Sequence, residues 1–328
     1  MIIVRTPLRI SLFGGGTDFP EYFKLNGGAV IGSAINKYIY HSISHFPSWL
    51  FDHKIRFAYR VVEQVKDIDE LKHLPFKEIL RYHKIFENIE VNLSSDLPSF
   101  TGLGSSSSFT VGLIKGLSAF NGQLIDMDTL ARTAIYLERD VLYESVGFQD
   151  QIFASYGGFN HVKFYGAKRY EIERININEN LTSELSESLV MFYTGRTRRA
   201  SDIEENKLKK IDSNIKTLDR MRECVDDALK ILSSGKPFDE IGSLLDESWQ
   251  LKRTLSREVS NGYIDELYEL GMKNGALGGK LLGAGGGGFL LFYVPRRSME
   301  KFKNALSHLH EVNFSLNAQG SSIIHAGA

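Results

Sequence analysis

The sequence predicts an α+β protein with two domains. Its 328 residues are enough for two ordinary domains, each with its own core. Segments with strand and helix patterns mix in both halves, without the strict alternation that a doubly wound parallel sheet requires. Strand patterns dominate the first half and long amphipathic helices the second. We therefore expect residues 1–175 to form an N-terminal domain and residues 176–328 a C-terminal domain.

The patterns of the first half define its elements. Residues 8–13 form a short apolar strand that ends at three glycines, and residues 29–46 contain a long β-branched and aromatic stretch. Residues 88–95 alternate apolar and polar side chains, as a half-buried strand does. We also expect helices at 76–87, 105–121 and 126–143, and strands at 159–164 and 169–177.

In the second half of the chain, the spacing of apolar residues mainly predicts helices. Apolar residues recur at helical intervals over 213–234, which predicts a long amphipathic helix. Ser201 and Glu204 have the spacing of a capping box, which predicts a helix start there. We also expect helices at 238–253, 264–274 and 298–309, and strands at 188–193, 289–294 and 311–316.

Composition excludes several classes of protein. The chain is 42% hydrophobic and 24% charged, which is typical of globular proteins. Its net charge of −1 gives no reason to expect a nucleic acid or an anionic membrane as a partner. The first residues lack the apolar stretch of a signal peptide, and no run approaches a membrane span. The single cysteine, Cys224, excludes an intrachain disulfide, so we expect a cytoplasmic protein.

The most informative motif is P-S-F-T-G-L-G-S-S-S-S at residues 98–108. It follows a predicted strand and opens a predicted helix, so unpaired backbone N–H groups converge where an anion fits. Gly102 and Gly104 let the main chain approach a phosphate, and the serine hydroxyls add donors and a candidate Mg²⁺ ligand. No lysine stands at the helix start, so this is not a Walker A loop. A serine-capped helix without a ligand is the alternative.

A second glycine-rich segment, residues 283–288, formally matches the G-x-G-x-x-G fingerprint of dinucleotide-binding folds. That fingerprint needs a strand before it and a helix after it. Here a predicted helical segment lies upstream and a strand follows, which argues against a dinucleotide-dependent oxidoreductase. Four consecutive glycines indicate instead a loop that another group approaches closely, rather than a merely flexible connection.

A third segment lies near the N-terminus, where a strand carrying Arg9 leads through three glycines to Thr17 and Asp18. The Asp18 carboxylate could accept hydrogen bonds from sugar hydroxyls, although capping a turn is the commoner role for such an aspartate. An arginine on a strand is more often a surface residue than a catalytic one.

Together the three segments resemble the signature motifs of the GHMP small-molecule kinases, which include galactokinase, homoserine kinase, mevalonate kinase and phosphomevalonate kinase. The motifs stand in the superfamily's order along the whole chain. Their forms are most similar to the branch of D-glycero-D-manno-heptose 7-phosphate kinases. The resemblance implies an N-terminal domain like ribosomal protein S5 domain 2 and a ferredoxin-like C-terminal domain. ATP and a sugar phosphate, the small-molecule partners it implies, would meet in the cleft between them.

The resemblance also implies roles for particular residues. Asp150, in G-F-Q-D-Q, matches the family's base, and Arg9 matches the cation that keeps this carboxylate ionised. Ser106 and Glu138 match the ligands of Mg²⁺, a cation that often takes only one or two oxygens from the protein. The β- and γ-phosphates of ATP would lie on Gly102, Leu103, Gly104, Ser105, Ser106, Ser107 and Ser108.

Ordinary structural roles remain open for the two acids. Glu138 could be a solvated helix residue, and Asp140 and Glu144 are neighbouring candidates for the metal. Asp150 could be a helix N-terminal acid.

The sugar is expected to contact Gly16, Thr17, Asp18, Gly285, Gly286, Arg198 and Arg199. The two arginines belong to G-R-T-R-R, between a predicted strand and the capped helix at Ser201. Cations beside backbone N–H groups at a helix start suit a phosphate dianion. A basic, solvated loop is the alternative for this segment.

We therefore expect an ATP- and Mg²⁺-dependent kinase that phosphorylates the anomeric hydroxyl of D-glycero-D-manno-heptose 7-phosphate, for bacterial nucleotide-heptose and surface-glycan biosynthesis. A superfamily kinase for galactose, fucose or an N-acetylhexosamine is the alternative, but those sugars give the arginine loop no anion to hold. A mevalonate-type acid is disfavoured because Asp18 repels a carboxylate. A non-catalytic sensor of sugar and ATP would lack the base or the metal ligand, whereas Asp150, Ser106 and Glu138 are all present.

Overall fold

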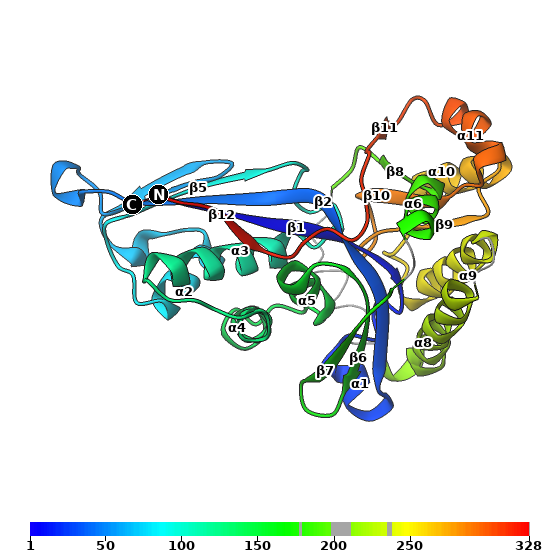
Figure 1. Ribbon diagram of the computed structural model, residues 1–328, viewed down its shortest axis with the longest axis horizontal. Helices are drawn as coiled ribbons and strands as arrows, with labels where there is room; N and C mark the ends of the chain where they lie inside the picture. The colour runs from blue at the N-terminus through cyan, green and yellow to red at the C-terminus, as the bar shows by residue number, and fades with distance from the viewer. Residues whose placement is uncertain (177–178, 198–210, 235–237, 328) are drawn as a thin grey trace.

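The computed structural model describes residues 1–176, 179–197, 211–234 and 238–327, and it confirms the α+β class. Two sheets carry most of the strands, and helices pack against each of them (Figure 1). The predicted capping box at Ser201 and Glu204 lies outside the described residues.

The first sheet has eight strands in the order β12-β1-β2-β5-β3-β4, with β6 added to β2 and β7 to β6. Strand β2 is long enough to pair with three neighbours, because β5 joins its second half and β6 its first half. All pairings are antiparallel except that of β3 with β5. The strands are β1 (Ile2–Phe13), β2 (Gly28–His45), β3 (Ile55–Ala58), β4 (Val62–Val65), β5 (Ile89–Ser95), β6 (Phe159–Tyr165), β7 (Arg169–Arg174) and β12 (Ser322–Ala326).

Helices α2 to α5 lie together on one side of this sheet (Figure 1). Helix α3 packs on β1 and β2 and positions the tetraserine run against them. Its glycines allow this closeness, since a Cβ at Gly116 would lie 2.3 Å from the Ile43 side chain. The helices are α1 (Pro20–Asn26), α2 (Leu74–Tyr82), α3 (Ser105–Phe120), α4 (Met127–Tyr136) and α5 (Gln149–Tyr156), with a π-helical turn at Leu137–Val141 and short 3₁₀ turns at Ser48–Leu50 and Ile68–Glu70.

The second sheet has four antiparallel strands in the order β11-β8-β10-β9. Helix α9 packs on β9 and β10, and α8 packs on α9 and also reaches β1 and β2 of the first sheet. The strands are β8 (Leu189–Tyr193), β9 (Gly278–Leu281), β10 (Phe289–Tyr293) and β11 (His310–Glu311). The helices are α6 (Glu179–Ser188), α8 (Ile211–Ser233), α9 (Asp239–Leu255), α10 (Gly262–Lys273) and α11 (Met299–Ala305), preceded by a 3₁₀ turn at Arg296–Ser298.

The end of the chain returns to the first sheet, where β12 pairs antiparallel with β1. The amino group of Met1 donates to the carbonyl of Gly327 (3.2 Å), and the two termini lie close together in Figure 1. The sequence analysis did not predict β12, and the strand expected at 311–316 is reduced to β11.

The sequence analysis missed one strand and extended one α-helix too far. The helix expected at 264–274 is confirmed as α10, but the unpredicted strand β9 lies between it and Gly283, so residues 282–288 connect two antiparallel strands as a hairpin. The conclusion against a dinucleotide fold still holds, because a strand and no helix follows these glycines. The helix expected at 126–143 is α-helical only to Tyr136, where it widens into the π-helical turn Leu137–Val141 that carries Glu138.

Most other elements agree with their predicted ranges. Cys224 is fully buried on α8, as its apolar face predicts. Within the described part of the chain, no helix is long and apolar enough to cross a lipid bilayer.

Candidate active site

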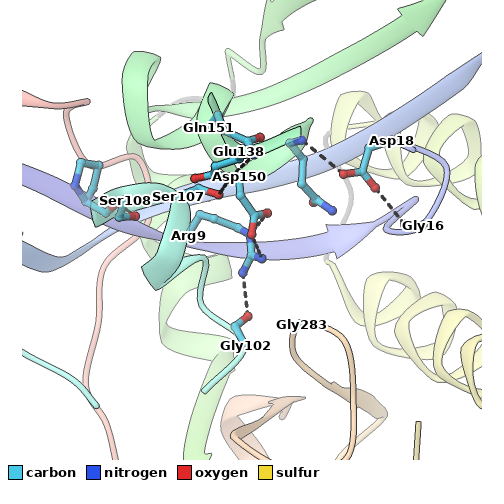
Figure 2. A network of polar contacts seen from close by, with 12 residues as sticks. Arg9, Gly16, Asp18, Gly102, Ser107, Ser108, Glu138, Asp150, Gln151 and Gly283 are labelled. Carbon is cyan, nitrogen blue, oxygen red and sulfur yellow. Dashed lines mark hydrogen bonds and ion pairs between the residues drawn. The ribbon is translucent and has the colours of Figure 1, made fainter. Parts of the chain in front are cut away.

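A pocket lies where loops of the first sheet meet the hairpin β9–β10 of the second. Its walls come from β1 and the glycine turn after it, from the starts of α3 and α5, and from α9. Figure 2 shows these segments around the polar contacts described below. The predicted site residues that line the pocket are Arg9, Gly16, Asp18, Gly102, Gly104, Ser105, Ser106, Ser107, Asp150 and Gly285.

Arg9 and Asp150 form a bidentate ion pair at the centre of this pocket (Figure 2). Arg9 Nε donates to Asp150 Oδ1 (2.7 Å) and Nη2 to Oδ2 (2.6 Å). The third guanidinium nitrogen, Nη1, donates to the carbonyl of Gly102 (2.6 Å). The Arg9 side chain is only 6% exposed and that of Asp150 24%, so the carboxylate faces the pocket while the cation supports it from behind.

The N-terminus of α3 opens beside this ion pair. Gly104 precedes the helix in the left-handed conformation (φ 74°), and no side chain caps the first turn. A Cβ at Gly104 would lie 3.2 Å from Asp150 Oδ2, so glycine keeps the helix start close to the carboxylate. Unpaired N–H groups in the first turn of a sixteen-residue helix favour an anion.

Two of the predicted nucleotide contacts support the fold instead of lining the pocket. Leu103 is fully buried, and its carbonyl accepts from the backbone N–H of Arg9 (3.0 Å). Ser108 is also buried, and its hydroxyl donates to the carbonyl of Pro7 (2.8 Å). Both contacts fasten residues 98–108, the predicted phosphate loop, to β1.

The phosphate loop and the hairpin β9–β10 touch backbone to backbone. A Cβ at Gly102 would lie 2.4 Å from the carbonyl oxygen of Leu282, and one at Gly283 would lie 2.3 Å from Gly102 Cα. Both glycines have positive φ, 84° and 68°. The sequence analysis expected that another group approaches this glycine-rich segment closely, and the structure confirms it, with the main chain of the phosphate loop as that group.

Glu138 lies beneath the first turn of α3 and is fully buried. Its Oε2 accepts hydrogen bonds from Ser107 Oγ (2.8 Å) and from Gln151 Nε2, whereas its Oε1 has no partner among the described residues. Burial and the nearby Glu144 raise the pKa of Glu138 to about 8. The alternative of a solvated helix residue is wrong for Glu138. The serine that contacts it is Ser107, whereas Ser106 is exposed on the pocket wall.

Asp18 also lines the pocket and is held by the glycine turn after β1 (Figure 2). Its Oδ1 accepts from the backbone N–H of Gly16 (3.0 Å) and its Oδ2 from that of Gln149 (3.2 Å). Burial and the neighbouring Asp150 raise the pKa of Asp18 to about 6. Gly147 explains part of the G-F-Q-D-Q motif, since a Cβ there would lie 1.9 Å from Asp18 Oδ2.

Of the other residues predicted to contact the sugar, some line the pocket and some do not. Thr17 is fully buried outside the pocket lining, and its hydroxyl donates to the carbonyls of Gly14 and Ala29 (both 2.8 Å), which fixes the turn. Gly285 lines the pocket, and Gly286 instead donates its N–H to the carbonyl of Val259 (3.0 Å). Arg198 and Arg199 lie outside the described residues.

Several pocket residues were not predicted. Lys252 and Lys280 are 6% and 3% exposed, and the Lys280 ammonium donates to the carbonyl of Leu12 (2.7 Å), which ties β9 to β1. Lys280 lies between Gly279 and the glycine-rich segment that begins at Gly283, and a lysine so close to these glycines is the signal that could have identified it. Ser11 and Gln149 also line the pocket. Gln149 lies inside the G-F-Q-D-Q motif and Ser11 on the strand that carries Arg9, but the sequence analysis assigned neither residue a role.

The sequence of this chain is similar to two family models and to several kinases. Residues 58–158 match the family described as GHMP kinases N terminal domain, and residues 227–311 match GHMP kinases C terminal. The D-glycero-alpha-D-manno-heptose 7-phosphate kinase of Campylobacter jejuni is 33% identical over 303 residues, which cover 89% of each chain. The galactokinase of Thermotoga maritima is 24% identical, covering 96% of this chain and 95% of the relative.

Solved structures support the same fold. The crystal structure of a D-glycero-D-manno-heptose 1-phosphate kinase from Bacteriodes thetaiotaomicron superposes with a TM-score of 0.82 and covers 100% of both chains. Since the two sequences are only 22% identical, this likeness concerns the fold alone.

Proposed function

Because this chain belongs to the GHMP kinase family and is an ATP-dependent sugar kinase, we propose that it phosphorylates the anomeric hydroxyl of D-glycero-D-manno-heptose 7-phosphate in the cytoplasm. The product would be the 1,7-bisphosphate, a precursor for nucleotide-activated heptose and surface glycans. The observation that carries the proposal is the Arg9–Asp150 ion pair, which faces one pocket together with the uncapped start of α3.

The proposed reaction uses this arrangement directly. The β- and γ-phosphates of ATP bind to the N–H groups at the start of α3, near the hydroxyls of Ser105 and Ser106. Asp150 accepts the proton of the sugar hydroxyl, and the sugar oxygen forms a bond to the γ-phosphorus. The bond from this phosphorus to the β–γ bridging oxygen breaks, and ADP leaves. Arg9 stabilises the negative charge that develops on the attacking oxygen.

Mg²⁺ fits the donors that the structure provides. The Oε1 atom of Glu138 is buried and has no hydrogen-bond partner among the described residues. It is a carboxylate oxygen, the kind of hard ligand that Mg²⁺ prefers. Ser107, which contacts this carboxylate, and Ser106, on the pocket wall, offer hydroxyl ligands. The described residues contain no cluster of three or more His, Cys, Asp or Glu side chains that could hold a metal, which fits a cation shared with phosphate oxygens. When bound, Mg²⁺ supplies charge neutralisation on the transferred phosphate.

Two observations favour a phosphorylated heptose as the acceptor. The relative that is 33% identical is a heptose 7-phosphate kinase. The segment that leads to the two arginines also lies against the glycine-rich hairpin, since the carbonyl of Arg196 accepts from the N–H of Gly288 (2.8 Å). In this proposal Arg198 and Arg199 bind the 7-phosphate of the sugar, and Asp18 binds its hydroxyls.

An ATP-consumption assay over a panel of sugars tests this proposal. The panel contains D-glycero-D-manno-heptose 7-phosphate, D-mannose, D-galactose and L-fucose, and ³¹P NMR identifies the product. We expect turnover with the heptose phosphate and a new anomeric phosphate signal. Preferential turnover of an unphosphorylated sugar would instead support a galactokinase- or fucokinase-like activity. A product phosphorylated at any other position would exclude the proposed chemistry.

A further inference from the structure

Two polar side chains in the wall of the active-site pocket have unsatisfied hydrogen-bonding atoms. The hydroxyl of Ser11, on β1, and the side-chain carbonyl oxygen of Gln149, at the start of α5, are shielded from water and have no partner among the described residues. Ser11 is 6% exposed and Gln149 8%, and both line the pocket. An unsatisfied buried polar group costs about 1–3 kcal/mol, so two of them side by side require an explanation.

Both side chains converge on Gly15, which lies between them in the glycine turn. A Cβ placed at Gly15 would lie 3.2 Å from Ser11 Oγ and 3.7 Å from Gln149 Nε2. Gly15 also lines the pocket, and its φ does not lie in the left-handed region that favours glycine. The turn therefore does not need glycine at this position for its conformation. A side chain at this position would crowd the Ser11 hydroxyl and lie against Nε2 of the Gln149 amide, whose Oε1 is the unpartnered atom, and glycine leaves both groups uncovered.

The neighbouring groups show what kind of ligand fits this space. Asp18 lies in the same wall, with its two oxygens already oriented by backbone N–H groups of Gly16 and Gln149. The Gln149 amide can accept a hydrogen bond at Oε1 and donate from Nε2, the atom nearer Gly15, and Ser11 Oγ can donate or accept one. A sugar hydroxyl does both, so one or more hydroxyls of a sugar ring complement this set. A carboxylate does not, because it cannot donate and would meet the charge of Asp18.

We propose that Ser11 and Gln149, together with the open space at Gly15, form a recognition site for hydroxyl groups of the acceptor sugar. The site selects polyhydroxylated substrates against deoxy analogues and acids. A pocket that hydrogen-bonds a substrate hydroxyl rejects the analogue without it, because its own buried groups then stay unpaired. This inference rests on the proposed function and adds specificity-determining residues to it.

Isothermal titration calorimetry with three variants tests the site. Ser11→Ala and Gln149→Met remove the polar atoms, and Gly15→Ala fills the space between them. We expect each to weaken the binding of D-glycero-D-manno-heptose 7-phosphate about 5- to 50-fold and to leave the Kd of ATP within about twofold. The matched control is Ser155→Ala, since Ser155 is buried with an unpartnered hydroxyl on α5 but lies outside the pocket lining. It should change neither Kd.

Two further readouts separate recognition from a merely structural role. Thermal unfolding without ligand should give Ser11→Ala a Tm no lower than that of the wild type, because the variant removes an unsatisfied buried hydroxyl. Titration with single-deoxy analogues of the sugar should identify one hydroxyl whose loss weakens wild-type binding but does not weaken Gln149→Met further. If every deoxy analogue loses the same factor of affinity in the wild type and in Gln149→Met, the inference is contradicted.

The outcomes distinguish this inference from the proposed function. If the wild type does not bind the heptose phosphate but binds D-mannose, D-galactose or L-fucose, the proposed substrate is wrong. The recognition site is still supported if the three variants lose that binding. Wild-type affinity in Ser11→Ala and Gln149→Met overturns the recognition site, whichever sugar binds. If the wild type binds none of these sugars, both proposals fail.

Discussion

Replacing Asp150 by asparagine tests the aspartate's role in phosphoryl transfer. Asn keeps the size of the side chain but removes its charge and its capacity to accept a proton from the sugar. Loss of a general base lowers kcat by about 10²–10⁴-fold, which corresponds to about 3–5 kcal/mol of activation free energy. ATP affinity should stay nearly intact, since in the proposed mechanism the phosphates bind at the start of α3 and not at Asp150.

The same substitution has a cost in stability that must be measured separately. Arg9 is almost fully buried and bonds both carboxylate oxygens of Asp150. Asn offers only one acceptor oxygen, so one charge-assisted hydrogen bond is lost while the bond to Gly102 remains. Hydrogen bonds to charged groups contribute about 1.5–3 kcal/mol, and we expect the free energy of unfolding to fall by about that amount.

Single-turnover kinetics with saturating ATP, combined with chemical denaturation, separates the two effects. Asp128→Asn is the matched control, because Asp128 also pairs with an arginine, Arg132, but lies outside the pocket lining. The control should keep wild-type kcat. A folded Asp150→Asn enzyme whose kcat stays within about threefold of the wild type refutes the assignment of Asp150 as base.

Three other substitutions have defined outcomes. Gly283→Ala places a Cβ 2.3 Å from Gly102 Cα at a positive φ, so we expect a lower Tm and weaker ATP binding, and an unchanged protein would contradict the close packing. Burial raises the pKa of Glu138 to about 8, so without Mg²⁺ its contribution to stability is present below about pH 4.5 and is lost as the pH rises towards 8. Glu138→Gln should flatten the metal-free stability profile between these values and weaken Mg²⁺ binding, and a profile that keeps its wild-type slope would argue against this. Arg9→Lys keeps a positive charge but cannot pair in bidentate fashion, so kcat should fall at least tenfold in the sugar-kinase assay while the fold is retained.

The features that sequence reasoning found are local in the chain. The tetraserine run, the triglycine turn and the hairpin glycines are each a contiguous pattern whose backbone requirements follow from residue type alone. Arg9, Asp18 and Asp150 were identified through the family's motifs, and the structure brings all three into one pocket. Local pattern was thus sufficient to locate the pocket.

The features that sequence reasoning missed depend on tertiary contacts. Ser11 and Gln149 are isolated polar residues, and only the fold shows that they lie in the pocket wall without partners. Strand β12 is short and half exposed, so its pattern is weak, and its pairing with β1 spans the whole chain. Strand β9, before the hairpin glycines, was missed for a related reason. Gly278–Leu281 is rich in glycine, and its pairing with β10 overrides that weak strand propensity.

The choice between neighbouring serines also needed the structure. Successive residues of a helix point about 100° apart, so Ser106 and Ser107 face different directions once the start of α3 is fixed. Ser106 lies exposed on the pocket wall and Ser107 donates to the buried Glu138. The resemblance named Ser106 alone, and the structure shows that the serine hydroxyl bonded to the Glu138 carboxylate is that of Ser107.

The most direct measurement is a crystal structure of the protein with Mg²⁺, a non-hydrolysable ATP analogue and D-glycero-D-manno-heptose 7-phosphate. We predict that the terminal phosphate lies on the N–H groups at the start of α3 and that the anomeric oxygen lies about 2.6–3.2 Å from the carboxylate of Asp150. Polyphosphate bound elsewhere, or an anomeric oxygen turned away from Asp150, would contradict the proposed transfer.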